Sequence, residues 1–448
     1  MKDRTWQRLG IADVALLNRQ GRLGLLYLAA MALFLTADQN ILFPNLILIE
    51  REFAVDRFQM GLVSSAFTVL GALMALAWGY LADRSSRKRL LVWAVILGEI
   101  PCLLTGFART YEELLFWRIL TGFGVGGMIP ISFSLLGDYF TPSQRNAANA
   151  WFGALMGLGV VLGMLVAGVV GPALGWRLPF VLLALPNFLL VPLFWRYCPE
   201  PQRGQGEPEL RALLEHQVSL PLPPPGGFPA LFRVPTNLLA FLQGIPGCIP
   251  WGVLPAFIIT YYVETKGYSI SSATLMTVIF GAGSLAGSLL GGMAGARVQL
   301  AAQAYLPLFI GASIFLGAFP AFLVVGYPTG TGRGIVTSTF LALLTGTVAG
   351  MAGPNVKALL MNVNLPENRG AIASLFALTD SIGRGAGPLL GGWLAVRHGL
   401  GWTLNFAISF WFVSALVWLA IAFTAPRDVS LARATVAARA RLALDGRE

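Results

Sequence analysis

Long apolar segments separated by short polar ones restrict the fold of this sequence more than any other feature. Each segment is about 20 residues long, the length at which an α-helix crosses a hydrocarbon core of roughly 30 Å. Charged residues make up only 12% of the chain, about half of what a soluble protein carries. The segments lack the alternation of a membrane β-strand, so we predict an all-α integral membrane protein with twelve transmembrane helices. The predicted helices cover residues 23–49, 60–82, 90–108, 112–137, 147–172, 178–197, 236–263, 272–294, 300–325, 335–362, 370–396 and 401–424.

The distribution of lysine and arginine predicts how these helices are oriented. Of the 31 basic residues, 21 fall on the side of the N-terminus and seven on the other side. Basic residues beside a membrane helix remain cytoplasmic during insertion. We therefore predict a multi-pass protein of the inner (plasma) membrane with both termini in the cytoplasm and no cleaved signal peptide. Because the net charge of +10 is spread over separate loops, we expect no nucleic-acid partner.

The residues that metal, redox and ATP sites require are scarce. Cys102, Cys198 and Cys248 are too few and too scattered for a disulfide framework. His216 and His398 fall outside the predicted helices, which argues against a histidine metal site or an intramembrane histidine relay. The G-x-x-x-x-G-K-[ST] loop of ATP-driven pumps is missing from the sequence. We therefore predict no metal, no cofactor and no enzymatic activity.

The chain repeats itself with an offset of half its length. Residues 118–175 and 342–399 are identical at 16 of 58 positions, where chance would give roughly four or five. We therefore predict a six-helix bundle over 1–197 and another in the same orientation over 236–424. A proline-rich cytoplasmic connector, 198–235, joins them, and a basic cytoplasmic tail, 425–448, ends the chain. Within the connector, "PELRALLEHQV" is predicted to form a short surface helix.

The stretch "GYLADRSSRKRLL" between the second and third predicted helices carries a family resemblance. It is similar to the loop signature G-x-L-A-D-R-x-G-R-K-x of the major facilitator superfamily. The two six-helix halves with a long middle loop also resemble this superfamily. Asp83 can face the positive N-terminus of a neighbouring helix, and the arginines can pair with acids at helix ends. We expect a conformational latch that holds the two halves together in the outward-open state; the alternative is topogenic charge alone. The latch residues are Gly79, Asp83, Arg84, Arg87, Lys88 and Asp138.

Polar residues inside the predicted helices are the candidate site residues, because charges in a membrane interior are costly and usually functional. Asp38, near the membrane midplane, is the expected proton carrier, with Glu99 and Asp380 as further proton-coupling candidates. Glu99 precedes Pro101 and has a structural alternative, as does Asp380, which lies one turn from Arg384 and can neutralise it. Arg118 resembles the family's R-x-x-x-G-x-G signature but could instead snorkel to the interface. The expected substrate-binding residues are Asp38, Gln39, Asn40, Arg118, Gln243, Trp251, Asn355, Lys357, Asp380 and Arg384.

The segments "ADQNILFPNL" and "GDYFTPSQR" resemble the spinster branch of the superfamily, whose substrates are lysophospholipids and sphingolipids. The resemblance implies a secondary active transporter that works by alternating access and is coupled to protons. The first hypothesis is an amphipathic, lipid-like substrate, with Lys357 on its anionic head and Trp251 and Phe257 on its tail. A small organic anion or sugar acid moved by proton symport, and a non-transporting receptor or scaffold, are the alternatives. We expect a monomer surrounded by membrane lipids.

Overall fold

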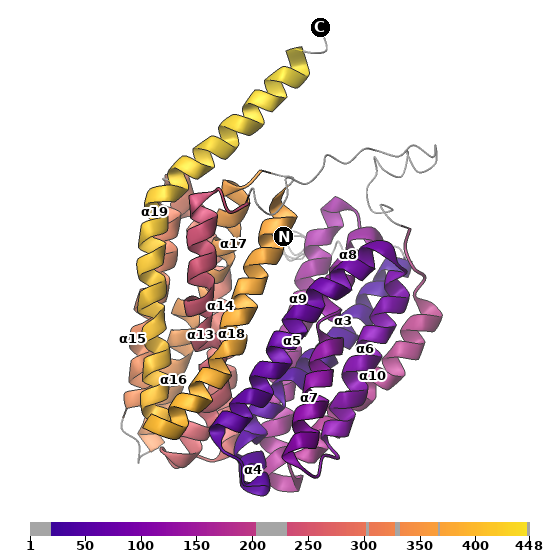
Figure 1. Ribbon diagram of the computed structural model, residues 1–448, viewed down its shortest axis with the longest axis vertical. Coiled ribbons are helices and arrows are strands. Elements are labelled where there is room, and N and C mark those ends of the chain that lie inside the picture. The colour runs from indigo at the N-terminus through magenta and orange to yellow at the C-terminus, as the bar shows by residue number, and fades with distance from the viewer. Residues whose placement is uncertain (1–18, 203–230, 302–303, 328–331, 366–367, 446–448) are drawn as a thin grey trace, which may run out of the picture. The chain divides into compact units, whose positions relative to one another are not determined.

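The computed structural model describes residues 19–202, 231–301, 304–327, 332–365 and 368–445, and its chain divides into two compact units, 1–221 and 222–448 (Figure 1). The boundary lies inside the predicted connector. In the first unit the helices are α3 (Arg19–Asn40), α4 (Leu42–Phe53), α5 (Arg57–Arg84), α6 (Arg87–Thr105), α7 (Tyr111–Val125), α8 (Met128–Tyr139), α9 (Pro142–Leu174) and α10 (Arg177–Tyr197). In the second unit they are α13 (Pro235–Glu264), α14 (Ile270–Ala301), α15 (Tyr305–Gly326), α16 (Gly332–Gly350), α17 (Ala352–Val363), α18 (Arg369–His398) and α19 (Leu400–Asp445).

The all-α membrane fold is confirmed. Ten helical segments of the described residues are long and apolar enough to cross a membrane. The more polar helices α6 and α18 coincide with the third and eleventh predicted spans. The described helices therefore account for all twelve predicted spans.

Three predicted spans are each built from two consecutive helices, α3–α4, α7–α8 and α16–α17. In every case the second helix has a proline as its third residue, namely Pro44, Pro130 and Pro354. Proline has no N–H to donate to the carbonyl four residues earlier and its ring crowds that carbonyl. The helical ladder is therefore interrupted at the preceding turn, which the apolar composition alone did not reveal.

The last helix extends beyond the predicted membrane span. Helix α19 continues through Asp445, so most of the predicted tail, 425–448, belongs to the same helix as the last span. The short surface helix predicted at 208–218 lies outside the described residues.

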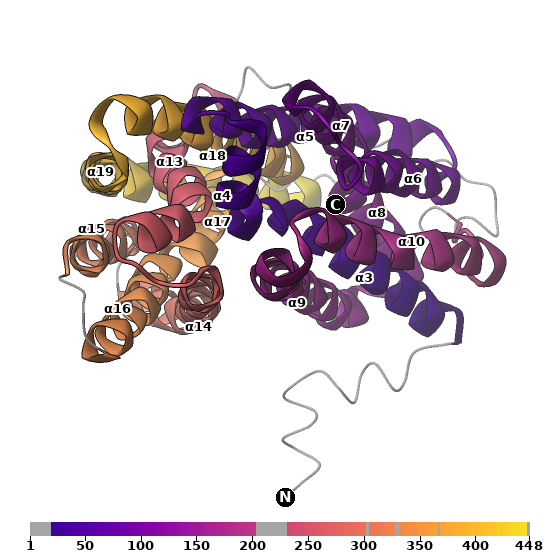
Figure 2. The same cartoon turned by 90° about the horizontal axis from the view of Figure 1, so that it is seen from below.

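The repeated glycines mark corresponding helix contacts in the two units. Figure 2 shows the two helix pairs concerned, α3 with α9 and α13 with α18. A side chain at Gly163 in α9 would overlap the carbonyl oxygen of Ala37 in α3. A side chain at Gly387 in α18 would likewise press against the carbonyl oxygen of Ile249 in α13. Close approach of two backbones requires glycine at such positions, so the repeat preserves a packing interface inside each unit.

Gly163→Leu is expected to destabilise the protein by about 3 kcal/mol, the upper end of the overpacking range. The obstacle is the backbone of α3, which cannot rotate away as a side chain can. Gly153→Leu is the matched control, since a side chain at this position on the same helix meets nothing within 4 Å. Thermal unfolding of both variants in detergent should separate them, and equal melting temperatures would contradict the packing argument.

Candidate functional site

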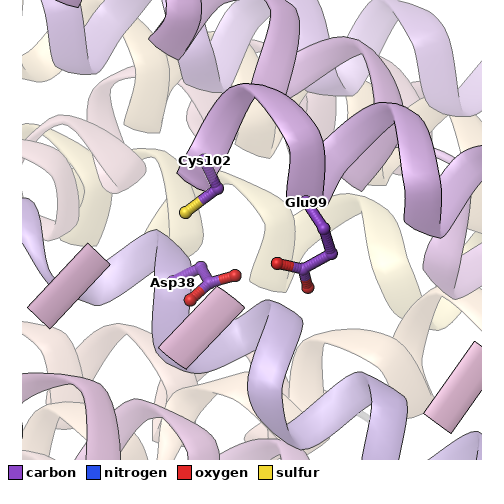
Figure 3. Close-up of side chains that lie close together, drawn as sticks. All are labelled: Asp38, Glu99 and Cys102. Atoms are coloured by element: carbon purple, nitrogen blue, oxygen red, sulfur yellow. The ribbon is translucent and has the colours of Figure 1, made fainter. Parts of the chain in front are cut away.

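A cluster of Asp38, Glu99 and Cys102 lies buried in the first unit (Figure 3). One ligating atom from each side chain lies within 4.8 Å of the others. Asp38 comes from the last turn of α3, and the other two residues come from α6, three positions apart and therefore on one helical face. Figure 3 shows the two carboxyl groups and the thiol pointing toward one another.

Arg118 of α7 supplies the positive charge beside this cluster. Its side chain is 1% exposed, which excludes the alternative of an arginine that snorkels to the interface. The guanidinium carbon lies 4.5 Å from the centre of the Phe67 ring, and Nη1 donates to the backbone oxygen of Asp38 at 3.5 Å. The aromatic ring and the carbonyl thus hold the cation in the interior.

The hydrogen bonds of the cluster are incomplete. Asn187 of α10 donates through Nδ2 to Glu99 Oε1 and to the Met31 oxygen. The other oxygen of Glu99 and both carboxylate oxygens of Asp38 are buried and accept no hydrogen bond from the described residues. A buried acceptor without a donor costs about 1–3 kcal/mol, so three such oxygens in one place mark a site that needs a further proton or ligand.

Formal charges narrow what this ligand can be. Two carboxylates face one guanidinium, which leaves one negative charge uncompensated. A single proton or a monovalent cation balances that charge. A divalent metal at Asp38, Glu99 and Cys102 would face the fixed positive charge of Arg118 at short range and leave the group net positive while the thiol keeps its proton. The donor set therefore fits a proton better than a divalent metal.

The two polar residues after Asp38 are less buried. Gln39 and Asn40 are both half-exposed within their unit. Their side-chain amides donate to the helix itself, Gln39 to the Leu35 oxygen at 3.2 Å and Asn40 to the Thr36 oxygen at 2.8 Å. Of the three consecutive polar residues, Asp38 alone points into the buried cluster.

A second group of charged residues lies in the other unit, where Lys357 and Arg384 both interact electrostatically with Asp380. Cys248 of α13 lies against the same pair of α18 residues. Lys357 and Arg384 are exposed within their unit and Asp380 is half-buried. This face of α17 is thus not covered by its own bundle.

The remaining predicted binding residues of this unit contribute to helix packing. Asn355 donates to the oxygens of Gly291 and Met351, both at 2.8 Å. Gln243 is buried and accepts from Ser414 at 3.3 Å. Trp251 is half-buried between Phe280 and Trp411, with ring centroids 5.7 and 5.9 Å away. Phe257, expected on a substrate tail, is fully buried in the bundle.

The predicted latch loop contains an ion pair between Arg87 and Asp138, which joins α6 to α8 inside the first unit. The sequence analysis missed Glu200, whose carboxylate accepts from the Arg87 N–H at 2.7 Å and from the Ser86 hydroxyl. Arg84 lies over Tyr80, and Lys88 lies over Trp195. Gly79 is half-buried and a Cβ there would touch Pro130 at 3.8 Å. The side chain of Asp83 lies outside the described residues.

Comparison with known proteins identifies the family. The model of the Major Facilitator Superfamily matches residues 28–348. The chain belongs to the major facilitator superfamily. A solved bacterial homologue of the human lysosomal transporter Spinster, in an inward-facing and unoccupied conformation, has a TM-score of 0.79 and 19% identity over 92% of this chain and 98% of its own. At this identity the likeness shows that the two chains share a fold.

Curated members of the superfamily resemble parts of the chain. The 3-(3-hydroxy-phenyl)propionate transporter of Escherichia coli is 36% identical over 179 residues, which is 38% of this chain and 43% of that protein. The Benzoate transport protein of Acinetobacter baylyi is 24% identical over 382 residues, 78% of each chain. The chain thus spans less than half of the first relative and about four fifths of the second.

Cys102 of the buried cluster and Asn187, the hydrogen-bond partner of Glu99, were not predicted as site residues. Cys102 was weighed only for disulfides, although its spacing of three from Glu99 places both on one face of α6. Asn187 was not considered, although an amide flanked by Pro186 within an apolar helix is a detectable signal. The contact between α3 and α6 that brings Asp38 to Glu99 is tertiary and has no signal in a single sequence.

Proposed function

We propose that the protein is a proton-coupled secondary transporter in which one proton, held between Asp38 and Glu99, couples the pH gradient to transport. The supporting observation is the buried pair of carboxyl groups whose free oxygens accept no hydrogen bond from the described residues. A proton on either group makes it a donor to the other and balances the excess negative charge beside Arg118. Arg118 then stabilises the remaining carboxylate.

For the substrate we propose an organic anion with an apolar body. Lys357 and Arg384 lie exposed beside Asp380, so one cation remains available for an anionic head. The relatives named for 3-(3-hydroxy-phenyl)propionate and benzoate favour a small aromatic acid. A lysophospholipid, the other occupant with an anionic head, is the second candidate, suggested by the spinster-like segments.

The distribution of basic residues supports an inner-membrane protein with both termini in the cytoplasm. Protease access to the C-terminal residues in inverted vesicles tests this orientation.

A thermal-shift screen of the full chain in lipid nanodiscs tests the substrate class. A ligand that binds the native state raises the melting temperature by mass action. We expect aromatic carboxylates to raise the melting temperature. The compound that does so should then be taken up into liposomes when a pH gradient is applied. Stabilisation by lysophospholipids alone would favour the second candidate. Binding without uptake would instead support a non-transporting receptor.

Lys357→Ala is expected to weaken binding of the anion found in this screen by about 1.5–3 kcal/mol, the range for a hydrogen bond to a charged group. Lys357→Arg should retain part of the affinity because it keeps the charge. Arg427→Ala, which removes an exposed charge from α19, is the matched control. Isothermal titration gives the affinities, and wild-type affinity in Lys357→Ala would exclude Lys357 from the binding site.

We also propose that the Arg87–Asp138 pair takes part in the conformational latch by holding α6 against α8 inside the first unit. Its side chains are 4% and 15% exposed, and breaking a buried pair leaves an uncompensated charge. Arg87→Ala should shift spin-label distances between helix ends toward the inward-open state, whereas the exposed Arg89→Ala should not. Identical distance distributions in wild type and Arg87→Ala would leave the loop with a topogenic role only.

A further inference from the structure

A cavity of about 370 Å³ lies between α6 and α10 of the first unit. Val92, Val95, Ile96 and Glu99 line it from one face of α6. From α10 it is lined by Asn187, Phe188, Val191, Pro192 and Trp195. Its volume lies within the range of small-molecule sites. Through Glu99 the cavity reaches the buried carboxyl cluster.

The polar end of this cavity contains unpaired acceptors. Glu99 Oε2 and Asn187 Oδ1 are buried and accept no hydrogen bond from the described residues. The Asn187 amide group already donates to Met31 and Glu99. Pro192 has no N–H, so the carbonyl of Phe188 lacks its usual helical donor. An occupant must therefore bring N–H or O–H donors to this end.

The other end of the cavity is apolar and open. Trp195 is 48% exposed there, and Lys88 Nζ lies 4.8 Å from the centre of its ring. An elongated molecule with its donor at Glu99 would place its apolar body along Val95 and Val191, toward Trp195 at the open end.

From this arrangement we infer that the cavity binds a lipophilic primary or secondary amine, whose N–H groups donate to Glu99 Oε2 and Asn187 Oδ1. An ammonium also balances the negative charge that two carboxylates and one guanidinium leave uncompensated. Charge-assisted hydrogen bonds of this kind are about twice as strong as neutral ones. An alkyl carboxylate would be repelled by the negative charge of Glu99, and a trimethylammonium group has no N–H to donate. Neither group therefore fits the polar end of the cavity.

Such an amine competes with the proton for Glu99. This consequence rests on the proposed function, whereas the binding site itself does not. Where Glu99 shares the coupling proton with Asp38, an amine in the cavity inhibits pH-driven uptake without competing with the transported anion. Raising the anion concentration therefore does not relieve the inhibition.

Photo-crosslinking of the full chain in nanodiscs tests the site. The probe is decylamine with a diazirine in its chain, and the matched probes carry trimethylammonium or carboxylate on the same chain. We expect saturable labelling of the cavity residues of α6 and α10 by the amine alone, which excess plain decylamine abolishes. Labelling spread evenly over the exposed apolar surface, or equal labelling by the three probes, overturns the proposal.

Two variants sharpen this test. Glu99→Gln exchanges one acceptor oxygen for a donor and should reduce the apparent affinity at least about tenfold. Val92→Phe narrows the cavity without changing its polar end and should also reduce labelling. This variant tests the site independently if Glu99→Gln is too unstable to purify. Leu189→Phe, exposed on α10 and outside the cavity, should label as wild type. Wild-type labelling of Val92→Phe overturns the site, whereas intact labelling in a protein without proton-coupled uptake overturns only the proposed function.

Discussion

Asp38→Asn is expected to abolish uptake driven by a pH gradient while exchange of substrate between equally loaded compartments continues. Asparagine is close to aspartate in shape but cannot take up and release the coupling proton, so the gradient loses its link to transport. Exchange needs the conformational cycle with substrate bound and no net proton movement. Liposomes containing the purified protein measure both processes with the anion identified by thermal shift.

The matched control for this experiment is Glu112→Gln, which neutralises an exposed acid in the first turn of α7. It should retain pH-driven uptake and exchange. Loss of both activities in Asp38→Asn would indicate a structural role for Asp38, and unchanged pH-driven uptake would remove the residue from the coupling mechanism.

Arg118→Leu is expected to lower the stability of the protein by about 3–5 kcal/mol, the range for leaving a buried charge uncompensated. The substitution leaves two carboxyl groups in the interior without their cation and removes the contact with the Phe67 ring. Adding Asp38→Asn to this variant should recover a large part of the loss, because it removes one of the uncompensated charges. Thermal unfolding in detergent of the single and double variants forms the double-mutant cycle.

Arg196→Leu, which replaces an exposed arginine near the end of α10, is the control and should melt close to wild type. A double variant that is as unstable as the sum of its single changes would mean that Arg118 and Asp38 do not interact. The guanidinium would then be held by the Phe67 ring and the backbone carbonyl of residue 38.

Among its described residues, the second unit shows no matching pair of buried carboxyl groups. The equivalent glycines Gly163 and Gly387 contact Ala37 and Ile249, respectively. The residue that follows is Asp38 in the first unit and Pro250 in the second, so a proline occupies the position equivalent to Asp38. The repeat therefore preserves helix contacts and leaves each unit free to carry its own charges. This division supports proton coupling in the first unit and anion binding in the second.

The sequence predicted the helices well because length and apolar character are properties of each segment alone. The repeat was equally visible, since glycines and prolines required by close backbones and helix breaks recur at a fixed offset. Side-chain direction was harder to predict. Lys357 lies in an apolar block, yet its helix face is not covered by its own bundle, and Asp38 meets Glu99 only because α3 packs beside α6. Such contacts depend on helix rotation, which continuous apolar segments do not encode.

Infrared difference spectroscopy of the protein in lipid, recorded as pH is varied, tests most directly whether Asp38 and Glu99 hold a proton. A protonated carboxylic acid has a C=O stretch distinct from that of a carboxylate, so the measurement needs no substrate. We expect wild type and Glu112→Gln to show a titrating band of a protonated carboxyl group that both Asp38→Asn and Glu99→Gln remove or shift. A spectrum without this band, or a band that neither substitution changes, would contradict the proposal that this pair carries the coupling proton.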